Sequence, residues 1–177
     1  TGKTALVRQL INYYFLTDFD PTIEDTYEYK TNIDDIDIKT VIIDTGGSDD
    51  LSPMWPSSVR RGDGFMIVYC IDDRESFEKV ENFIRLIYSV KKLDINLNNI
   101  PIVICENKID LEDKRVVRKE EGEQLANKYK THFVQTSALT KTNIQNSFEN
   151  LIRYTMENYE DKDSKNDKND KKKCIIN

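Results

Sequence analysis

The sequence predicts an α/β fold of three layers, in which a mostly parallel central sheet is wrapped by helices. Short apolar runs at residues 65–71, 101–105 and 132–136 have the length and composition of buried strands. Segments with helical spacing fill the gaps between them, and strands that alternate with helices are typical of a parallel sheet. With 177 residues, 38% of them hydrophobic, the chain is large enough for one domain with a sizeable core.

The chain begins in the second half of a phosphate-loop pattern. Thr1-Gly2-Lys3-Thr4 fits the end of Gly-x-x-x-x-Gly-Lys-[Ser/Thr], so we expect the first glycine of the pattern, and a buried strand, upstream of Thr1. In such a loop Lys3 reaches the β- and γ-phosphates, and the Thr4 hydroxyl coordinates Mg²⁺. Taken alone, the tripeptide is more often an ordinary helix start.

The other elements are assigned from periodicity. A helix is expected to start at Thr4, and residues 27–33 and 37–44 predict a hairpin that turns at Asp34 and Asp35. Further helices are expected over residues 74–92, 120–130 and 143–158. Two prolines in residues 51–58 predict that this segment is mostly loop, because proline inside a helix removes a hydrogen bond and clashes.

Charge and composition divide the chain into a domain, residues 1–158, and a tail, residues 159–177. The tail is charged and poor in aromatic residues, which predicts disorder. A net charge of −6 without a basic stripe through the body argues against nucleic acid as a main partner. Cys70 and Cys105 lie in apolar runs and are expected to be buried thiols in a reducing compartment. No apolar stretch approaches the roughly 18 residues that a spanning helix needs.

Polar residues that could bind a ligand follow the predicted strands. Asp44, residues 107–110 and Ser137 each stand where a strand ends, which is the edge of a parallel sheet where ligands bind. Asn107-Lys108-Ile109-Asp110 is in isolation more often a polar turn. Behind a buried strand, however, the Asp110 carboxylate can accept two hydrogen bonds from the N1–H and exocyclic amine of guanine, a donor pair that adenine lacks.

Five segments together resemble a Ras-type small GTPase of the Ras and Rap branch, over about residues 1–158. The segments are Gly2-Lys3-Thr4, Asp20-Pro21-Thr22-Ile23-Glu24-Asp25-Thr26-Tyr27, Asp44-Thr45-Gly46-Gly47, Asn107-Lys108-Ile109-Asp110 and Ser137-Ala138. The resemblance implies a phosphate-loop GTPase fold, called a G domain, with its first strand missing from this chain. It also implies a molecular switch that binds GTP or GDP with Mg²⁺ and hydrolyses GTP.

The resemblance assigns roles to individual residues. The residues expected to bind the nucleotide are Gly2, Lys3, Thr4, Ala5, Phe15, Thr22, Gly47, Asn107, Lys108, Asp110, Ser137 and Ala138. Those expected to hold the metal are Thr4, Thr22 and Asp44, and those expected to take part in hydrolysis are Lys3, Thr22, Gly47 and Ser48. The expected effector-binding residues are Asp20, Pro21, Thr22, Ile23, Glu24, Asp25 and Tyr27. Exchange factors and GTPase-activating proteins are further implied partners of a monomeric protein.

The sequence departs from the family pattern in the hydrolysis loop. Ser48 stands where the family has a glutamine that orients the attacking water, and Gly46 replaces the usual alanine. Because serine is too short to hold water and transition state together, we expect weak intrinsic hydrolysis that depends on an activating protein. Leu139, where the family often has lysine, leaves the main-chain contacts of Ala138 untouched.

The chain ends Cys174-Ile175-Ile176-Asn177, a pattern typical of prenylation at Cys174, although Asn177 is an unusual last residue. Lys171, Lys172 and Lys173 precede it. One lipid chain anchors only marginally, so this short basic cluster predicts reversible attachment to the cytoplasmic face of the plasma membrane.

Other readings stay open at this point. One is a non-catalytic or GTP-locked effector-binding module, and another is a fragment that cannot retain nucleotide. A more distant alternative, an adenine-using phosphate-loop enzyme, conflicts with Asp110.

Overall fold

The computed structural model describes residues 1–12, 22–47, 53–95, 99–160 and 172–176. A six-stranded sheet runs through its centre in the order β1-β2-β6-β3-β4-β5. Its strands are β1 (Glu24–Ile33), β2 (Ile36–Thr45), β3 (Gly64–Cys70), β4 (Ile102–Asn107), β5 (His132–Gln135) and β6 (Lys172–Ile176). The pair β1 and β2 is antiparallel and the other neighbours are parallel, which confirms the mostly parallel sheet.

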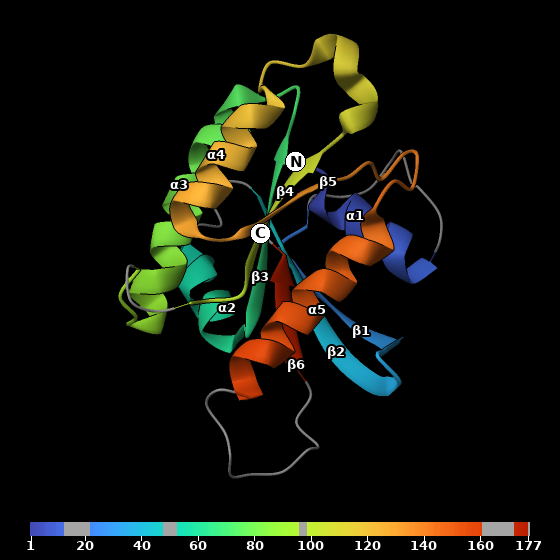
Figure 1. The fold of residues 1–177 in the computed structure, drawn as a ribbon, viewed down its shortest axis with the longest axis vertical. Coiled ribbons are helices and arrows are strands. Elements are labelled where there is room, and N and C mark those ends of the chain that lie inside the picture. The colour runs from blue at the N-terminus through green and yellow to red at the C-terminus, as the bar shows by residue number, and fades with distance from the viewer. Residues whose placement is uncertain (13–21, 48–52, 96–98, 161–171, 177) are drawn as a thin grey trace.

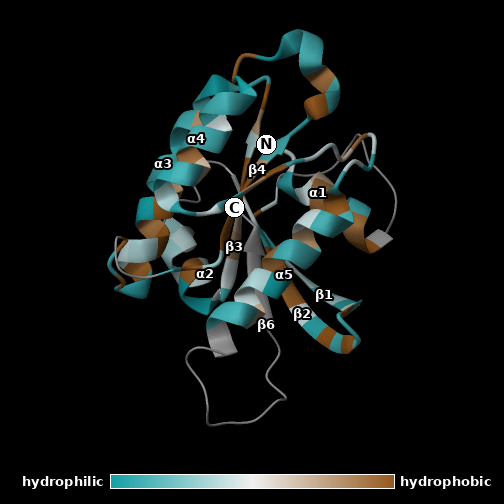
Figure 2. Cartoon of the chain, in the orientation of Figure 1, coloured by the Kyte–Doolittle hydropathy of each residue, from teal (hydrophilic) through white to brown (hydrophobic). Residues whose placement is uncertain are grey.

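Helices cover both faces of the sheet (Figure 1). On one face, α1 (Lys3–Asn12) and α5 (Ile144–Glu160) share a core with Met66 and Val68 of β3. On the other face, α2 (Trp55–Arg61), α3 (Arg74–Lys91) and α4 (Lys119–Tyr129) share a core with Ile67 and Tyr69. Alternate residues of one strand thus enter opposite cores, as the pleat requires. The hydropathy colouring shows mainly hydrophilic outward faces on α3 and α4 and hydrophobic bands along β2 (Figure 2).

The predicted hairpin and the three long helices form close to their expected bounds. Asp34 and Asp35 both have positive φ, 52° and 64°, which gives the tight turn that suits the twist of a two-residue hairpin. The start of α3 is capped by Asp73, whose side chain accepts a hydrogen bond from the Ser76 amide at 3.1 Å. α5 continues to Glu160, two residues beyond the expected end.

The expectation of loop for residues 51–58 is wrong for its second half. α2 begins at Trp55, and Pro56 falls in its first turn, where the amide of the helix has no intrahelical partner to lose. Residues 48–52 lie outside the described residues. Pro56 therefore favours the start of α2, and the prediction that it breaks a helix here is wrong.

Residues 172–176, expected to belong to a disordered tail, form strand β6 between β2 and β3. The main chain of Cys174 pairs with Ile42 on one side and with Gly64 on the other. β6 therefore lies in the middle of the sheet order. For residues 161–171, which lie outside the described residues, disorder stays a prediction.

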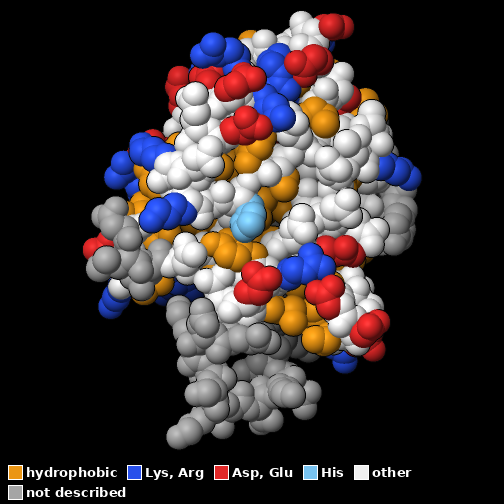
Figure 3. Space-filling view, viewed as in Figure 1, with side chains coloured by type: hydrophobic (Ala, Val, Ile, Leu, Met, Phe, Trp, Pro, Cys, Tyr) orange, Lys and Arg blue, Asp and Glu red, His pale blue; other side chains and the backbone are white. Residues whose placement is uncertain are grey.

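Acidic and basic side chains are interspersed on the face seen in Figure 3. Some of the acidic and basic side chains of the protein form ion pairs, for example Arg153 with Asp34 at 3.1 Å and Lys119 with Glu123 at 3.2 Å. Among the described residues, no helix is both long and apolar enough to cross a membrane.

Candidate functional site

The phosphate-loop residues meet the start of α1, as predicted. Gly2 has a φ of +85°, and a Cβ on it would lie 2.7 Å from Nδ2 of Asn107, so both its conformation and its surroundings require glycine. Lys3 is the first residue of α1 and is only 7% exposed. Burial lowers the pKa of its ammonium group, although the Asp44 carboxylate opposes this effect. A Cβ on Gly47 would lie 2.7 Å from Nζ of Lys3, so Lys3 and the Gly47 backbone lie against each other.

Asp44, at the end of β2, is fully buried beside this lysine. Both of its carboxylate oxygens lack a hydrogen-bond partner among the described residues. Burial raises the pKa of Asp44 to about 6, against the opposing effects of the nearby Thr4 hydroxyl and of the Lys3 charge. The hydroxyls of Thr4 and Thr22 hydrogen-bond to each other at 2.8 Å. Two hydroxyls and a buried carboxylate without partners are oxygen ligands that suit Mg²⁺, directly or through water.

Backbone contacts tie the loops around this site to one another. The amide of Gly46 donates to the carbonyl of Ile23 at 2.8 Å, which joins the end of β2 to the segment after Thr22. Trp55 of α2 donates its indole N–H to the carbonyl of Gly46 at 3.2 Å and packs on Phe83 of α3, with ring centroids 4.6 Å apart. The segments that carry Thr22 and Gly47 are thus connected to α2 and α3.

Asn107, the last residue of β4, joins the two halves of the site. Its side-chain amide donates to the carbonyl of Thr1 at 3.0 Å, and its side-chain oxygen accepts from the hydroxyl of Thr136 at 3.1 Å. The thiol of Cys70 donates to the same Thr1 carbonyl at 3.2 Å. The phosphate-loop residues are therefore held to the ends of β3 and β4.

The remaining motif residues gather at the same edge of the sheet. Lys108 has a φ of 64° and starts a 3₁₀ helix, Ile109–Lys114, while its ammonium lies 3.3 Å from the Asp72 carboxylate. The hydroxyl of Ser137 donates to Asp110 and accepts from the amide of Thr140 at 3.1 Å. Ala138 is buried next to it. Asp110 and Ser137, 27 residues apart in the chain, thus meet as the strand-end argument predicts.

Several predicted site residues cannot be placed. Phe15, Asp20, Pro21 and Ser48 lie outside the described residues. Ala5 lies in the first turn of α1, and Ile23, Glu24, Asp25 and Tyr27 lie at or beside the start of β1.

Two residues at the edge of the site, Glu106 and Arg115, were not among those predicted from the sequence. Glu106 is fully buried in β4, directly before Asn107, and Arg115 lies 2.7 Å from its carboxylate. A charged residue inside an apolar strand was the available signal, because a buried carboxylate requires a partner.

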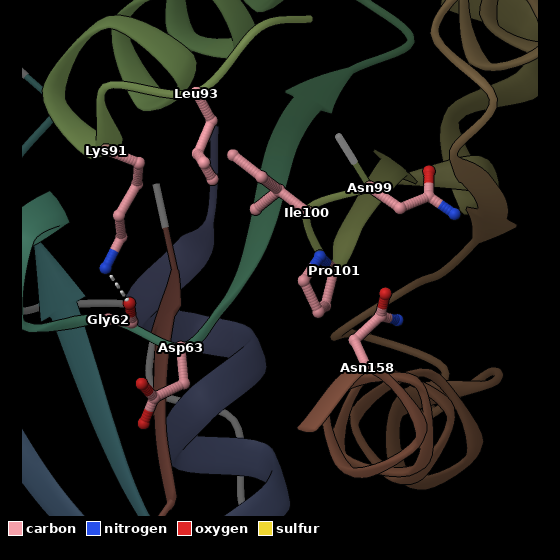
Figure 4. Close-up of a pocket in the computed structure, with 8 residues that line it drawn as sticks. All are labelled: Gly62, Asp63, Lys91, Leu93, Asn99, Ile100, Pro101 and Asn158. Carbon is pink, nitrogen blue, oxygen red and sulfur yellow. Dashed lines mark hydrogen bonds between the residues drawn. The ribbon is translucent and has the colours of Figure 1, made fainter. Parts of the chain in front are cut away.

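A separate hollow of about 140 Å³ lies at the other end of β3 and β4 (Figure 4). Lys91, the last residue of α3, donates there to the carbonyls of Arg60, at 3.1 Å, and Gly62, at 2.5 Å. The remaining lining is mixed, with Leu93, Ile100 and Pro101 on its apolar side. These contacts join α3 to the end of α2, and we assign this hollow no role in binding or catalysis.

The fold brings the start of α1, the oxygens of Thr4, Thr22 and Asp44, and the loop of Asn107 and Asp110 together at the same edge of the sheet, an arrangement typical of a nucleotide-binding domain. The family model described as Ras family matches residues 1–157. The chain is 40% identical over 152 residues to a Ras-like protein of Laccaria bicolor, a match that covers 86% of this chain and 71% of the relative. It is also 40% identical over 152 residues to protein ras-1 of Neurospora crassa, covering 86% and 70%.

The chain therefore belongs to the Ras family of small GTPases. It is a GTPase that binds GTP and GDP with Mg²⁺ and acts as a signalling switch, and effectors, exchange factors and activating proteins are its general classes of partner. The non-catalytic alternatives considered above are not favoured.

Proposed function

We propose that Thr4, Thr22 and Asp44 form the magnesium site and that Gly2, Lys3, Ala5 and Gly47 hold the phosphates. The observation that carries this proposal is the fully buried Asp44, whose two oxygens lack partners among the described residues beside the paired hydroxyls of Thr4 and Thr22. When bound, Mg²⁺ neutralises charge on the β- and γ-phosphate oxygens. Lys3 adds a buried positive charge to the same place, directly beside the Gly47 backbone whose amide is assigned to the γ-phosphate.

At the other end, the proposal assigns the guanine base to Phe15, Asn107, Lys108, Asp110, Ser137 and Ala138. The pairing of Ser137 with Asp110 supports this assignment because it orients the carboxylate that would accept from the base. The contact of Asn107 with Thr1 links the base-binding loop to the phosphate loop.

A competition experiment with fluorescent GDP tests both ends of the site in the full-length protein. Asp110→Asn should shift preference from guanine to xanthine nucleotides, because the amide donates where the carboxylate accepts. Asp44→Asn should weaken the stimulation of GDP retention by Mg²⁺. If Asp110→Asn loses GDP without gaining the xanthine nucleotide, the assignment of the base is wrong.

We further propose that intrinsic hydrolysis is slow and depends on an activating protein. Lys3, Thr22, Gly47 and Ser48 are the residues assigned to this step, and Ser48 supplies no amide to orient the attacking water. An arginine from an activating protein is worth roughly 10³ to 10⁵ in rate in this class of enzyme. Single-turnover hydrolysis should be faster in Ser48→Gln, and equal rates for the two proteins would contradict the proposal.

The effector surface is proposed to comprise Asp20, Pro21, Thr22, Ile23, Glu24, Asp25 and Tyr27. Ile23 is 63% exposed at the start of β1, and Asp25 beside it is exposed as well, so a partner would meet an apolar side chain flanked by acids. Tyr27 extends this surface along the same strand. Alanine substitution of Ile23 should weaken the binding of an effector domain without changing GDP affinity, in a protein that is a monomer by light scattering.

The proposed organisation is a G domain at residues 1–158 and a tail at 159–177 that is prenylated at Cys174. Lys171, Lys172 and Lys173 would add electrostatic attachment to the cytoplasmic face of the plasma membrane. An enzyme can attach a lipid to Cys174 only when the end of the chain is accessible. Residues 172–176 would therefore have to leave their place in β6 for Cys174 to be modified. The variant Cys174→Ser should no longer be found in the membrane fraction. The protein without its lipid should bind anionic vesicles through its lysines and be released by salt. Retention on the vesicles that does not depend on salt would contradict the proposal of a weak anchor.

A further inference from the structure

The side chain of Glu106 is fully buried in β4, where a carboxylate needs several donors. The hydroxyl of Tyr69 donates to it at 3.1 Å, Nε2 of Gln135 at 2.5 Å and Nη1 of Arg115 at 2.7 Å. Tyr69 and Gln135 are the residues directly opposite Glu106 in β3 and β5. One buried carboxylate therefore links three parallel strands at the edge where the site lies.

The neighbour of Glu106 in sequence faces the opposite side of the sheet. Glu106 bonds within the layer of Tyr69, which belongs to the core under α3 and α4. Asn107 bonds to Thr1 and lies against Gly2 at the nucleotide side. Because successive residues of a strand point to opposite faces, the bonds of Glu106 restrain the backbone that aims Asn107.

Arg115 extends this restraint to the loop between β4 and α4. Besides Glu106, it donates to the carboxylate of Glu112 at 2.8 and 2.9 Å and to the carbonyl of Val117 at 2.8 Å. Its side chain is only 15% exposed. The amides of Val116 and Val117 close the same loop on the carbonyl of Ile71, at 2.8 and 3.1 Å. The ion pair between Glu106 and Arg115 thus joins the two ends of the segment 108–114, which includes Asp110.

We propose that the Glu106–Arg115 pair is a positioning clamp that holds Asn107 and Asp110 in the geometry needed to discriminate guanine. Neither residue touches the base; they act by fixing the two ends of the loop that carries it. The inference rests on the proposed role of Asp110, and it adds a determinant of nucleotide specificity from the opposite face of the sheet. Removing Arg115 alone leaves a buried carboxylate short of a partner, whereas removing both charges does not.

The test compares GDP with inosine diphosphate, which lacks the exocyclic amine that Asp110 would accept from. Dissociation constants for both are measured in the full-length protein, in Arg115→Met and in Glu106→Gln/Arg115→Met. The wild type should prefer GDP by about tenfold or more, as expected for a hydrogen bond to a charged group. Both variants should reduce this preference toward one. The double variant should be the more stable of the two, so that discrimination is measurable even where Arg115→Met folds poorly.

Glu112→Gln is the matched control. It removes the 65% exposed carboxylate that Arg115 also contacts, while the buried pair remains, so the preference for GDP should be kept. An unchanged ratio of the two dissociation constants in the double variant would overturn the clamp and leave the pair a structural role. A wild type without preference for GDP would instead overturn the assignment of Asp110, and the clamp with it.

Discussion

Arg61 of α2 lies 2.6 Å from the carboxylate of Glu24 at the start of β1. Ser58, one helical turn earlier, donates to the same carboxylate. Partial burial is outweighed by these hydrogen bonds, which lower the pKa of Glu24. The first residue of β1, close to Thr22, is therefore connected directly to the helix that follows Gly47, so the segments that carry two of the proposed phosphate-site residues share an ion pair.

This pair predicts that Arg61 competes with any basic effector for Glu24. Arg61→Ala should strengthen the binding of such an effector domain, whereas Glu24→Gln should weaken it, both measured by titration calorimetry on the GTP-bound protein. The effect is expected to be about 0.2–1 kcal/mol, the range of a partly exposed ion pair. Arg60→Ala removes the same charge from the neighbouring exposed position and should leave the affinity unchanged. Equal effects of Arg60→Ala and Arg61→Ala would show that only net charge matters.

Glu81 predicts how stability changes in acid. The Tyr129 hydroxyl, Arg85 and Lys128 hold its pKa at about 2, below the usual 4.5, and so join α3 to α4. A carboxyl group whose pKa is lower in the folded state stabilises the fold above its unfolded pKa, and this contribution is lost as pH falls from about 4.5 toward 2. Since Glu81 is partly exposed, we expect a loss of only about 1 kcal/mol.

Urea unfolding at pH 7 and pH 3 measures this loss. Glu81→Gln should be less stable than the wild type at pH 7 and should show a smaller difference between the two pH values. Glu78→Gln, on the exposed side of the same helix, should follow the wild type at both. A pH dependence that is the same in all three proteins would exclude Glu81 as its source.

Gly122 predicts an unusual response to alanine. Glycine in the interior of a helix normally costs about 1 kcal/mol relative to alanine. In α4, however, a Cβ at this position would lie 2.4 Å from the Tyr69 hydroxyl and 2.5 Å from the ring of Phe133. We expect Gly122→Ala to destabilise the protein by about 1–3 kcal/mol in urea unfolding, because the helix must move away from the sheet. Tyr69→Phe removes the hydroxyl that this Cβ would meet but also a donor to Glu106, so the loss caused by Gly122→Ala should be smaller when measured in the Tyr69→Phe background than in the wild type. A stabilised Gly122→Ala protein would contradict this account.

The contacts of Lys91 are expected to stabilise the end of α2. Its ammonium donates to two carbonyls at the end of that helix, those of Arg60 and Gly62, and Figure 4 shows the contact with Gly62. A positive charge at this end interacts favourably with the helix dipole. Lys91→Met should weaken this end by about 1 kcal/mol, equivalent to roughly fivefold faster amide exchange in residues 55–61. Lys92→Met removes a neighbouring exposed charge and should leave the exchange as it is. Exchange accelerated equally by both would assign the effect to charge rather than to contact.

Periodicity and strand ends predicted most of the architecture, because these patterns depend on residues close together in the chain. The buried strand of Phe65 and Ile67 and the turn at Asp34 and Asp35 are of this kind. The meeting of Asp110 with Ser137 could also be predicted, since parallel strands end at one edge of the sheet. The failure at α2 came from reading Pro56 without its position in the helix.

Other relationships depend on distances that no local pattern encodes. Glu106 is charged in an apolar run, but only the folded sheet shows that Tyr69, Gln135 and Arg115 converge on it. The pairing of residues 172–176 with β2 and β3 is likewise a contact between distant parts of the chain. The charged composition of the preceding tail does not indicate it.

Trp55 is the chain's single tryptophan, and its indole joins the Gly46 carbonyl to the ring of Phe83. Its emission therefore comes from one place, the connection between the loop after β2 and the helix behind it. A change in that hydrogen bond or in that ring contact alters the polarity and quenching around one indole. The unlabelled protein thus carries a native fluorescent reporter of the contact between Gly46 and α3, readable in a stopped-flow instrument as nucleotide is exchanged.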